Sequence, residues 1–418
     1  MQNRNMDIYI KQIAEEDYPA FAKISLRAYP TAYKASKTAL QDIIKGLKDH
    51  ESAYDMTYIG AYIDDQLVGG MRYYTFEMNF HGTMISAAGI GSVAVDLLHK
   101  KQHVAQKLID FADQRSKDLA IPLMTLYPFR PSFYKSFGYG YGSPLHHYKL
   151  APANFHDFKV HEGLSYLDEV DFAPIESCYM TYVNNHHGMM HKSTNDLRRI
   201  EKLEDCHLVV YKEDGQITGY MIFKQTGITE MNFLRQTIFI SEMIYNTTEA
   251  LKAFSTFLHR QKDQVEYIEL HTFDNRFYQF LDNVEYTPDT QVLPLISHRM
   301  HDTCLGMMYK VLDPAELIEW VEDRVNENLV FNITSPGHKA FSHESGNNQD
   351  IETFEINPGS TSPIEIDMDL AVFSSWIMGA VRLESLYFKG LVQCTQADKL
   401  AHLDRSFYLD APECHNTF

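Results

Sequence analysis

The sequence has few cysteines and no long apolar run, and both shortages narrow what the protein can be. Its five cysteines are scattered over 418 residues without a CxxC pair, which is typical of reduced thiols and not of a disulfide framework. The N-terminus, MQNRNMDIYIKQ, lacks the apolar stretch of a signal peptide. No segment approaches the roughly 20 apolar residues of a membrane span. We therefore expect a cytoplasmic protein with no membrane partner.

Positive charge is also scarce. The chain has 37 Lys and Arg against 56 Asp and Glu, a formal net charge of −19. This balance argues against nucleic acid as a partner, and it favours a cationic substrate. The alternative is that the acidic surface only keeps the protein in solution.

The length suits two or three domains, and three segments can be separated by pattern. The first, residues 1–150, alternates short apolar strands with helices, as in TYIGAYIDDQLVGGMRYYTFEM, a predicted hairpin that turns at Asp64 and Asp65. Such alternation predicts an α/β layer sheet. The second segment, 151–297, repeats that layout. The third, 298–418, opens with a helix that Asp313 caps and Pro314 starts.

The strongest pattern in the first segment is a strand, Ser92 to Val95, followed by a polar loop and an amphipathic helix from about Gln102. The first-turn amides of a helix lack intrahelical acceptors and carry the positive end of its dipole, so they bind phosphate. Two lysines, Lys100 and Lys101, add charge beside them. The simpler alternative is a plain amphipathic helix with a solvated lysine pair.

The second segment repeats the strand and helix but lacks the features of a phosphate-binding helix start. Its helix begins in YNTTEALKAF, with Thr247 or Thr248 as N-cap and Glu249 in the first turn. A carboxylate there would repel a pyrophosphate. We expect no nucleotide in this copy.

One strand and a short loop after the helix comes FYKSFGYGYG, Phe133 to Gly142. With the strand, loop and helix and the aromatic last residue, it makes the chain resemble the GCN5-related N-acetyltransferases of the enhanced intracellular survival type. The resemblance covers essentially the full length. It implies tandem acetyltransferase-like α/β domains, the second degenerate, followed by an α+β sterol-carrier-like domain. It also implies acetyl-CoA as co-substrate, no metal and a homo-oligomer, a hexamer in that family.

The resemblance assigns coenzyme contacts residue by residue. The amide of Val95 would donate to the thioester carbonyl, and Val93 would pair with the pantetheine amides. The pyrophosphate loop of the family corresponds here to a run whose coenzyme-binding members are Lys100, Lys101, His103 and Val104, closed by the small Ala105. His103 replaces the central glycine of the family pattern. Its side chain would narrow the approach of the backbone to the phosphate, or add a contact when protonated.

Acetyl transfer to an amine also needs an acid and a base. Tyr134 matches the family tyrosine that protonates the departing thiolate, and its ordinary pKa near 10 leaves it protonated at neutral pH. The strand residues 89–95 offer no carboxylate base. In the enhanced-survival type the C-terminal carboxylate takes that place, which here belongs to Phe418. The alternatives are a core tyrosine at 134 and a frayed, solvated chain end at 418.

A competing constellation is HHGMMH, with His186, His187 and His191, in which two histidines four apart could share a helix face as metal ligands. Gly188 interrupts it and no second ligand cluster is near, so we expect no metal. The predicted function is acetyl-CoA-dependent N-acetylation of a small-molecule or peptide amine, with Tyr29 and Tyr33 lining the acceptor site. Aminoglycosides are one acceptor class that the resemblance suggests. The alternative function is a non-enzymatic acyl-CoA-binding or regulatory protein.

Overall fold

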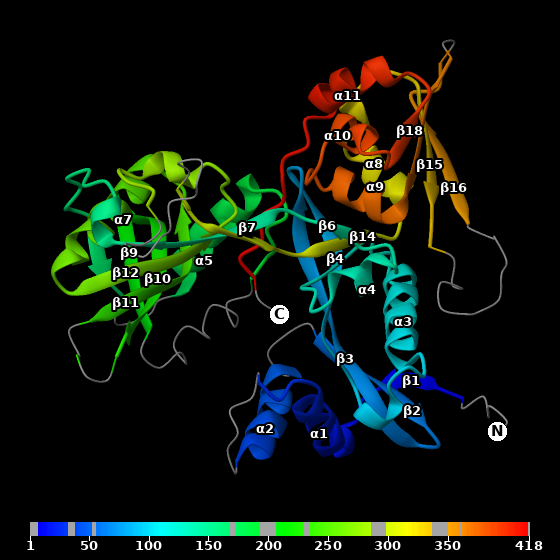
Figure 1. The fold of residues 1–418 in the computed structure, drawn as a ribbon, viewed down its shortest axis with the longest axis horizontal. Coiled ribbons are helices and arrows are strands. Elements are labelled where there is room, and N and C mark those ends of the chain that lie inside the picture. The colour runs from blue at the N-terminus through cyan, green and yellow to red at the C-terminus, as the bar shows by residue number, and fades with distance from the viewer. Residues whose placement is uncertain are drawn as a thin grey trace. The chain divides into compact units, whose positions relative to one another are not determined.

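A computed structural model of the chain describes residues 7–31, 38–51, 56–167, 172–192, 206–229, 232, 235–285, 298–336, 350–359 and 362–416 (Figure 1). Contacts divide it into two compact units. Residues from Met1–Gly142 and Met307–Pro412 form the first, and Ser143–Gly306 with Glu413–Asn416 form the second. In the described ranges, no helix has the length and apolarity needed to cross a membrane.

The first unit is built on a seven-stranded sheet. Its strands, in spatial order, are β1 (Tyr9–Gln12), β2 (Met56–Ile63), β3 (Gln66–Phe80), β4 (Thr83–Val95), β5 (Leu123–Leu126), β14 (Met308–Val311) and β6 (Gly140–Tyr141). β4 and β5 run parallel and the other neighbours antiparallel. The turn between β2 and β3 lies at Asp64 and Asp65, as predicted. Both have positive φ, 48° and 61°, as a two-residue hairpin requires.

Helices cover both faces of this sheet. α1 (Tyr18–Ala28) packs with α2 (Ala39–Glu51) and buries Tyr18, Phe21 and Ala22 in one core cluster. α3 (Val104–Asp118) buries its predicted apolar stripe in a second cluster, through Val104, Leu108, Ile109 and Ala112. The short α4 (Pro131–Lys135) follows β5.

The second unit has the same plan. Its sheet runs, in spatial order, β8 (Leu164–Tyr166), β9 (Cys206–Glu213), β10 (Gln216–Gly227), β11 (Gln236–Tyr245), β12 (Val265–Thr272), β7 (Pro144–Leu150) and β13 (Asp302–Leu305). α5 (Phe172–Asn185) packs on β10 and β11, and α7 (Thr248–His259) connects the parallel strands β11 and β12. Strand by strand, β8 to β12 correspond to β1 to β5.

The last two strands of each sheet come from distant parts of the chain. β14 follows the second unit in sequence but pairs with β5 and β6 of the first sheet. β7 follows β6 in sequence but pairs with β12 and β13 of the second. The sequence places segment boundaries at 150 and 297. β7 therefore belongs to the first segment but to the second sheet, whereas β13 and β14 both belong to the third segment and pair in the second and first sheets, respectively.

The C-terminal part of the first unit combines a second, four-stranded sheet with short helices. The strand order is β16 (Ile351–Ile356), β15 (Leu329–Thr334), β17 (Ile364–Asp369) and β18 (Val392–Cys394). The helices are α8 (Pro314–Glu319), α9 (Leu370–Ile377), α10 (Leu383–Phe388) and α11 (Leu400–Phe407). Asp313 caps α8 by accepting from Glu316 N–H at 2.9 Å, as predicted.

α9 of this part lies directly against β6. A Cβ at Gly140 would stand 2.1 Å from the Ala371 carbonyl oxygen, so this close approach requires a glycine. The C-terminal part is therefore packed on the strand that lies within the FYKSFGYGYG segment.

Candidate functional site

The carboxyl end of β4 separates from β5. Their parallel pairing runs from Ala87 with Leu123 to Gly89 with Thr125 and then stops, although β4 continues to Val95. A bulge accompanies the divergence, because Gly70 pairs with Ala94 while Arg72 pairs with Gly91, and Ser92 takes a positive φ of 49°. Such bulges re-aim a strand next to a site. Past Gly89, the β5-facing edge of β4 is thus open to a ligand.

Val95 presents its amide to this opening. The Asp96 N–H donates to the Val68 carbonyl on β3 at 2.9 Å. Because hydrogen bonding alternates along an antiparallel pair, the neighbouring Val95 directs its N–H away from β3. This orientation suits the predicted contact with a thioester carbonyl.

The carbonyl of Val93 already has a partner. The hydroxyl of Tyr29, at the C-terminal end of α1, donates to it at 2.5 Å. A pantetheine amide would share or replace that hydrogen bond. Tyr33, the second predicted acceptor-site tyrosine, lies outside the described residues.

The loop between β4 and α3 is shaped by two left-handed residues. Lys101 has φ 64° and His103 has φ 61° and ψ 14°. The resemblance places a glycine at His103, and the backbone here adopts the conformation in which glycine is favoured. Histidine is one of the residues that tolerate it better than most. The backbone at His103 therefore has the conformation that a glycine at this position would favour.

The N-terminus of α3 is uncapped by side chains. His103 is its N-cap residue but makes no capping hydrogen bond, and its Nδ1 lies 3.1 Å from Gln106 Oε1. The side chains of Lys100, Lys101 and His103 are exposed, whereas Val104 is buried and offers only its backbone. First-turn amides, two lysines and the open strand edge fit a pyrophosphate and the pantetheine that follows it.

Asp96 fixes the start of this loop. Its carboxylate accepts from Leu98 N–H at 2.9 Å and pairs with Arg27 at 3.0 Å. The hydrogen bond from Leu98, with the smaller effect of Arg27, outweighs burial and holds the pKa of Asp96 below its ordinary value. The ion pair connects the loop to α1. Neither Asp96 nor Arg27 was predicted as a site residue from the sequence.

Tyr134 lies on α4 and is only 2% exposed. Its ring makes edge contacts with Phe129, Phe133 and Tyr139 at centroid distances of 5.7, 5.2 and 5.9 Å. Burial raises the pKa of Tyr134 above its ordinary value. The phenol is therefore protonated at neutral pH, as a proton donor must be.

Tyr29 brings the predicted strand and the predicted acid together. Its hydroxyl donates to the Val93 carbonyl on β4, and its ring lies 6.5 Å from that of Phe129, which in turn contacts the ring of Tyr134. Phe129 is 62% exposed, so an aromatic surface lies beside Tyr134. Phe129 was not predicted from the sequence, although its place three residues after the end of β5 is a signal for a site residue in an α/β sheet.

Phe418, the predicted base, lies outside the described residues. The described chain ends at Asn416, and its last four residues, Glu413–Asn416, belong to the second unit. Glu413 accepts a hydrogen bond from the Tyr182 hydroxyl at 2.9 Å.

The corresponding helix start in the second unit is closed. Thr247, one of the two predicted N-caps, accepts from Ala250 N–H at 3.1 Å, and Glu249 stands in the first turn. A helix start that binds phosphate leaves such an amide free for the ligand. In α7 this amide, that of Ala250, already donates to the Thr247 side chain.

The histidines of HHGMMH are engaged separately. His186 stacks on Tyr182 with ring centroids 3.6 Å apart, His187 is buried, and His191 is exposed. Among the residues that the structure describes, no group of three or more His, Cys, Asp or Glu side chains is arranged to hold a metal ion.

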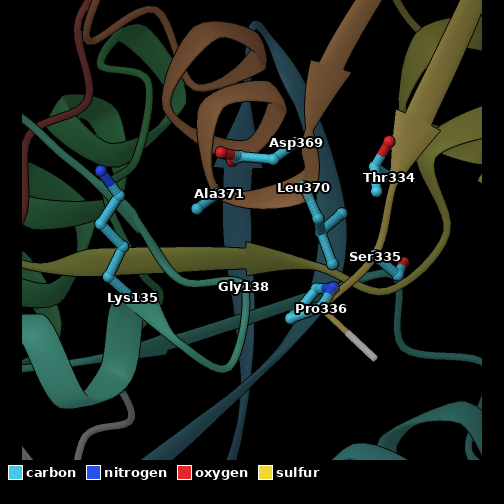
Figure 2. A pocket seen from close by; sticks show the side chains of 8 residues that line it. All are labelled: Lys135, Gly138, Thr334, Ser335, Pro336, Asp369, Leu370 and Ala371. Atoms are coloured by element: carbon cyan, nitrogen blue, oxygen red, sulfur yellow. The ribbon is translucent and has the colours of Figure 1, made fainter. Parts of the chain in front are cut away.

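Figure 2 shows a pocket of about 180 Å³ in the first unit, away from the predicted coenzyme residues. Lys135 and Gly138 meet the end of β15 and the start of α9 there, and the lining residues are Lys135, Gly138, Thr334, Ser335, Pro336, Asp369, Leu370 and Ala371. Asp369 already caps α9 through Val372 N–H at 2.8 Å. None of the predicted site residues lines it.

Comparison with known proteins agrees with this geometry. Two family models, both described as an acetyltransferase (GNAT) domain, match residues 9–142 and 187–300. No curated protein matches the sequence.

Solved structures match the fold over the whole chain. A GCN5-related N-acetyltransferase from Anabaena variabilis has a TM-score of 0.76 at 16% identity, covering 99% of this chain and 100% of that one. A probable N-acyltransferase from Enterococcus faecalis has 0.72 at 17%, with the same coverage. Eis1 from Mycobacterium abscessus has 0.72 at 16%, again covering 99% and 100%.

Proposed function

Because the chain belongs to the GCN5-related N-acetyltransferases, with the tandem fold that Eis1 also has, we propose that its first unit transfers acetyl from acetyl-CoA to an amine by direct attack. The observation that carries this proposal is that Tyr29 and Phe129 connect the open strand end at Val93 with the buried, protonated Tyr134. Lys100, Lys101 and the first-turn amides of α3 would hold the pyrophosphate, and the β4 edge at Val93 and Val95 would hold the pantetheine and thioester.

The proposed reaction forms one C–N bond and breaks one C–S bond. The amine nitrogen attacks the thioester carbon, and the Val95 amide stabilises the oxyanion that develops. The ammonium proton passes to the α-carboxylate of Phe418, directly or through water. Collapse of the tetrahedral species expels the thiolate, which takes the proton of Tyr134. The products are an amide and a free thiol, and return of the proton from the Phe418 carboxyl to the Tyr134 phenolate through water restores the enzyme, so atoms and charges balance.

The Phe418 carboxylate is the base in this scheme because β4 offers none. Residues Gly89 to Val95 contain no carboxylate. An α-carboxylate has an ordinary pKa of about 3.5 and becomes a stronger base where it is desolvated. A short extension beyond Phe418 removes that carboxylate, so an extended enzyme should lose most of its turnover while binding acetyl-CoA as before.

The acceptor is proposed to be a cationic small-molecule or peptide amine, since the net charge is −19 and Tyr29 and Phe129 offer aromatic faces to a cation. A homo-oligomer and a sterol-carrier-like C-terminal part, both implied by the family resemblance, and a cytoplasmic location, inferred from the scattered cysteines and the lack of a long apolar run, complete the proposal.

The direct test is release of free thiol from acetyl-CoA in the presence of polyamines, lysine peptides and aminoglycosides. We expect at least one class to raise thiol release above the amine-free rate and to gain the mass of one acetyl group. If acetyl-CoA binds but no amine is acetylated, acyl-CoA binding without catalysis replaces the proposal.

A further inference from the structure

The carboxyl ends of β11 and β12 are built like those of β4 and β5. Parallel pairing of β11 with β12 stops at Ile240 and Leu270, although β11 continues to Tyr245. Tyr245 pairs with Gly219 on β10 as Val95 pairs with Gly69 on β3. The second unit therefore has its own separated strand end, in the position that the proposed function gives to the reacting groups of the first.

The chain's own C-terminal segment occupies this strand end. The His415 ring lies 5.8 Å from that of Phe273, the residue directly after β12, and 6.0 Å from that of Tyr182 on α5. Tyr182 in turn lies 6.2 Å from Tyr245. Aromatic residues from α5, β11 and the end of β12 thus surround one histidine of the segment.

Polar contacts fix the segment at both ends. Glu413 N–H donates to the His187 carbonyl at 2.8 Å, and the Tyr182 hydroxyl donates to the Glu413 carboxylate at 2.9 Å. At the other end, Asn416 Oδ1 lies 2.9 Å from the Tyr179 hydroxyl. Tyr179 and Tyr182 are 0% and 4% exposed, and hydrogen bonds that are shielded from water in this way select one position for the segment.

The segment is buried at Cys414 and electrostatically matched at Glu413. Cys414, between the two anchors, is 4% exposed. Burial raises the pKa of Glu413, but His415, followed by the charge of His186 and the Tyr182 hydrogen bond, outweighs burial and holds that pKa below its ordinary value. A carboxylate facing two histidines and a phenol is the arrangement that recognises an acidic peptide.

We propose that the second unit is an intramolecular peptide-binding module, whose ligand is the segment Glu413–Asn416, and that Tyr182 is a positioning residue for catalysis. The strand end of the second unit binds this segment in place of a substrate. Phe418 follows Asn416 by two residues in the sequence, so a variant that releases the segment should also release the base of the proposed function. This second half rests on the proposed function, in which the Phe418 carboxylate is the base.

Labelling of Cys414 by a maleimide measures docking in the full-length protein. Mass mapping separates Cys414 from the exposed Cys304, which serves as internal reference. Tyr182→Phe removes the hydroxyl on Glu413, and Glu413→Gln removes the charge while keeping the shape. Tyr166→Phe and Glu162→Gln are matched controls in the same unit, because both residues are exposed.

Loss of a hydrogen bond to a charged group should raise the labelling rate of Cys414 by about tenfold or more in both variants, with Cys304 and both controls unchanged. Acetyl transfer by the variants should fall by a similar factor in kcat, with KM for acetyl-CoA unchanged. Slow Cys414 labelling in both variants would overturn the docking site. Fast labelling with native kcat would overturn the positioning role. Native protein without acetyltransferase activity would instead refute the proposed function, while labelling would still decide docking.

Discussion

The two units share one strand order and differ at the loop where a coenzyme would sit. Between β4 and α3 the first unit has residues 96–103, including two left-handed positions, whereas β11 and α7 of the second are separated only by Asn246 and Thr247. Thr247 caps its helix; His103 does not. The sheet alone therefore does not determine coenzyme binding. We expect the loop length and the helix amides to determine it.

A second difference concerns the strand carboxylate. β4 has none near its separated end, while β11 has Glu242, which is 8% exposed. Lys192 and the Tyr220 hydroxyl both bond to it. Burial raises the pKa of Glu242, but Lys192 and Tyr220 together outweigh burial and lower it. This carboxylate is a structural ion-pair partner and is not available as a base, which agrees with a second unit that binds peptide and does no chemistry.

Replacing the two matching tyrosines gives the largest expected contrast. Tyr134 follows Phe133 in the first unit, and Tyr278 follows Phe277 in the second. Tyr134→Phe should lower kcat by about 10² to 10⁴, because a positioned acid contributes that much, and should leave acetyl-CoA affinity nearly unchanged. Steady-state thiol release and calorimetry measure the two quantities. Tyr278→Phe is the matched control and should be fully active. A Tyr134→Phe enzyme with more than a tenth of native kcat would remove Tyr134 from the mechanism.

Breaking the Glu242 ion pair tests whether the second unit uses its carboxylate for stability. Lys192→Met leaves a buried carboxylate without its cation and should cost about 3 to 5 kcal/mol in the free energy of unfolding. Lys252→Met, which breaks the partly exposed pair with Glu249, should cost less than about 1 kcal/mol. Denaturant unfolding monitored in the second unit compares them. Equal costs would show that Glu242 is not held as an ion pair.

Local signals in the sequence predicted much of this site. The strand, loop and helix from Ser92, the cap of α8 at Asp313 and the turn at Asp64 all depend on neighbours within a few residues, so composition and spacing indicate them. The closed start of α7 was predicted for the same reason. Thr247 and Glu249 lie in the turn that they affect.

Long-range pairing could not be predicted in this way. The four residues of β14, MYKV, could form one short strand, and nothing in them indicates that their partners are β5 and β6. Tyr182 and Glu413 are hydrogen-bonded although they lie 231 positions apart. In the sequence, Tyr182 is an ordinary helix tyrosine and Glu413 an ordinary glutamate near the C-terminus. Tyr29 likewise depends on Val93, 64 positions away.

Replacing the two lysines beside α3 should weaken acetyl-CoA binding moderately, and only in the first unit. Replacing Lys100 and Lys101 with alanine should raise KM for acetyl-CoA by about three- to tenfold at low salt, because each charge near a helix start contributes roughly 0.3 to 1 kcal/mol, and the effect should shrink as salt screens it. Lys107→Ala, exposed one turn later, is the control.

Calorimetry also checks the second unit. Native protein should bind one acetyl-CoA per chain, and Glu249→Gln should not add a second, because Thr247 still caps α7. A stoichiometry of two in the native chain would contradict the proposed division of roles.

His103→Gly should give the smallest effect, on the residue where the loop departs from the family pattern. Glycine adopts the left-handed conformation of His103 (φ 61°) without a Cβ penalty and lets the backbone approach a phosphate more closely. KM for acetyl-CoA should therefore fall by about two- to fivefold. Stability should change by less than about 1 kcal/mol, since relief of strain is offset by the greater freedom of the unfolded chain.

Asp214→Gly separates the local effect of His103→Gly from a general one. Asp214 also has a positive φ, 50°, but it lies in the hairpin turn between β9 and β10 of the second unit. It should show the same small change in stability and no change in KM. If His103→Gly instead raises KM, and more so at pH 6 than at pH 8, then the protonated imidazole contacts the coenzyme. In that case His103 strengthens coenzyme binding, although its side chain was expected to limit the approach of the backbone to the phosphate.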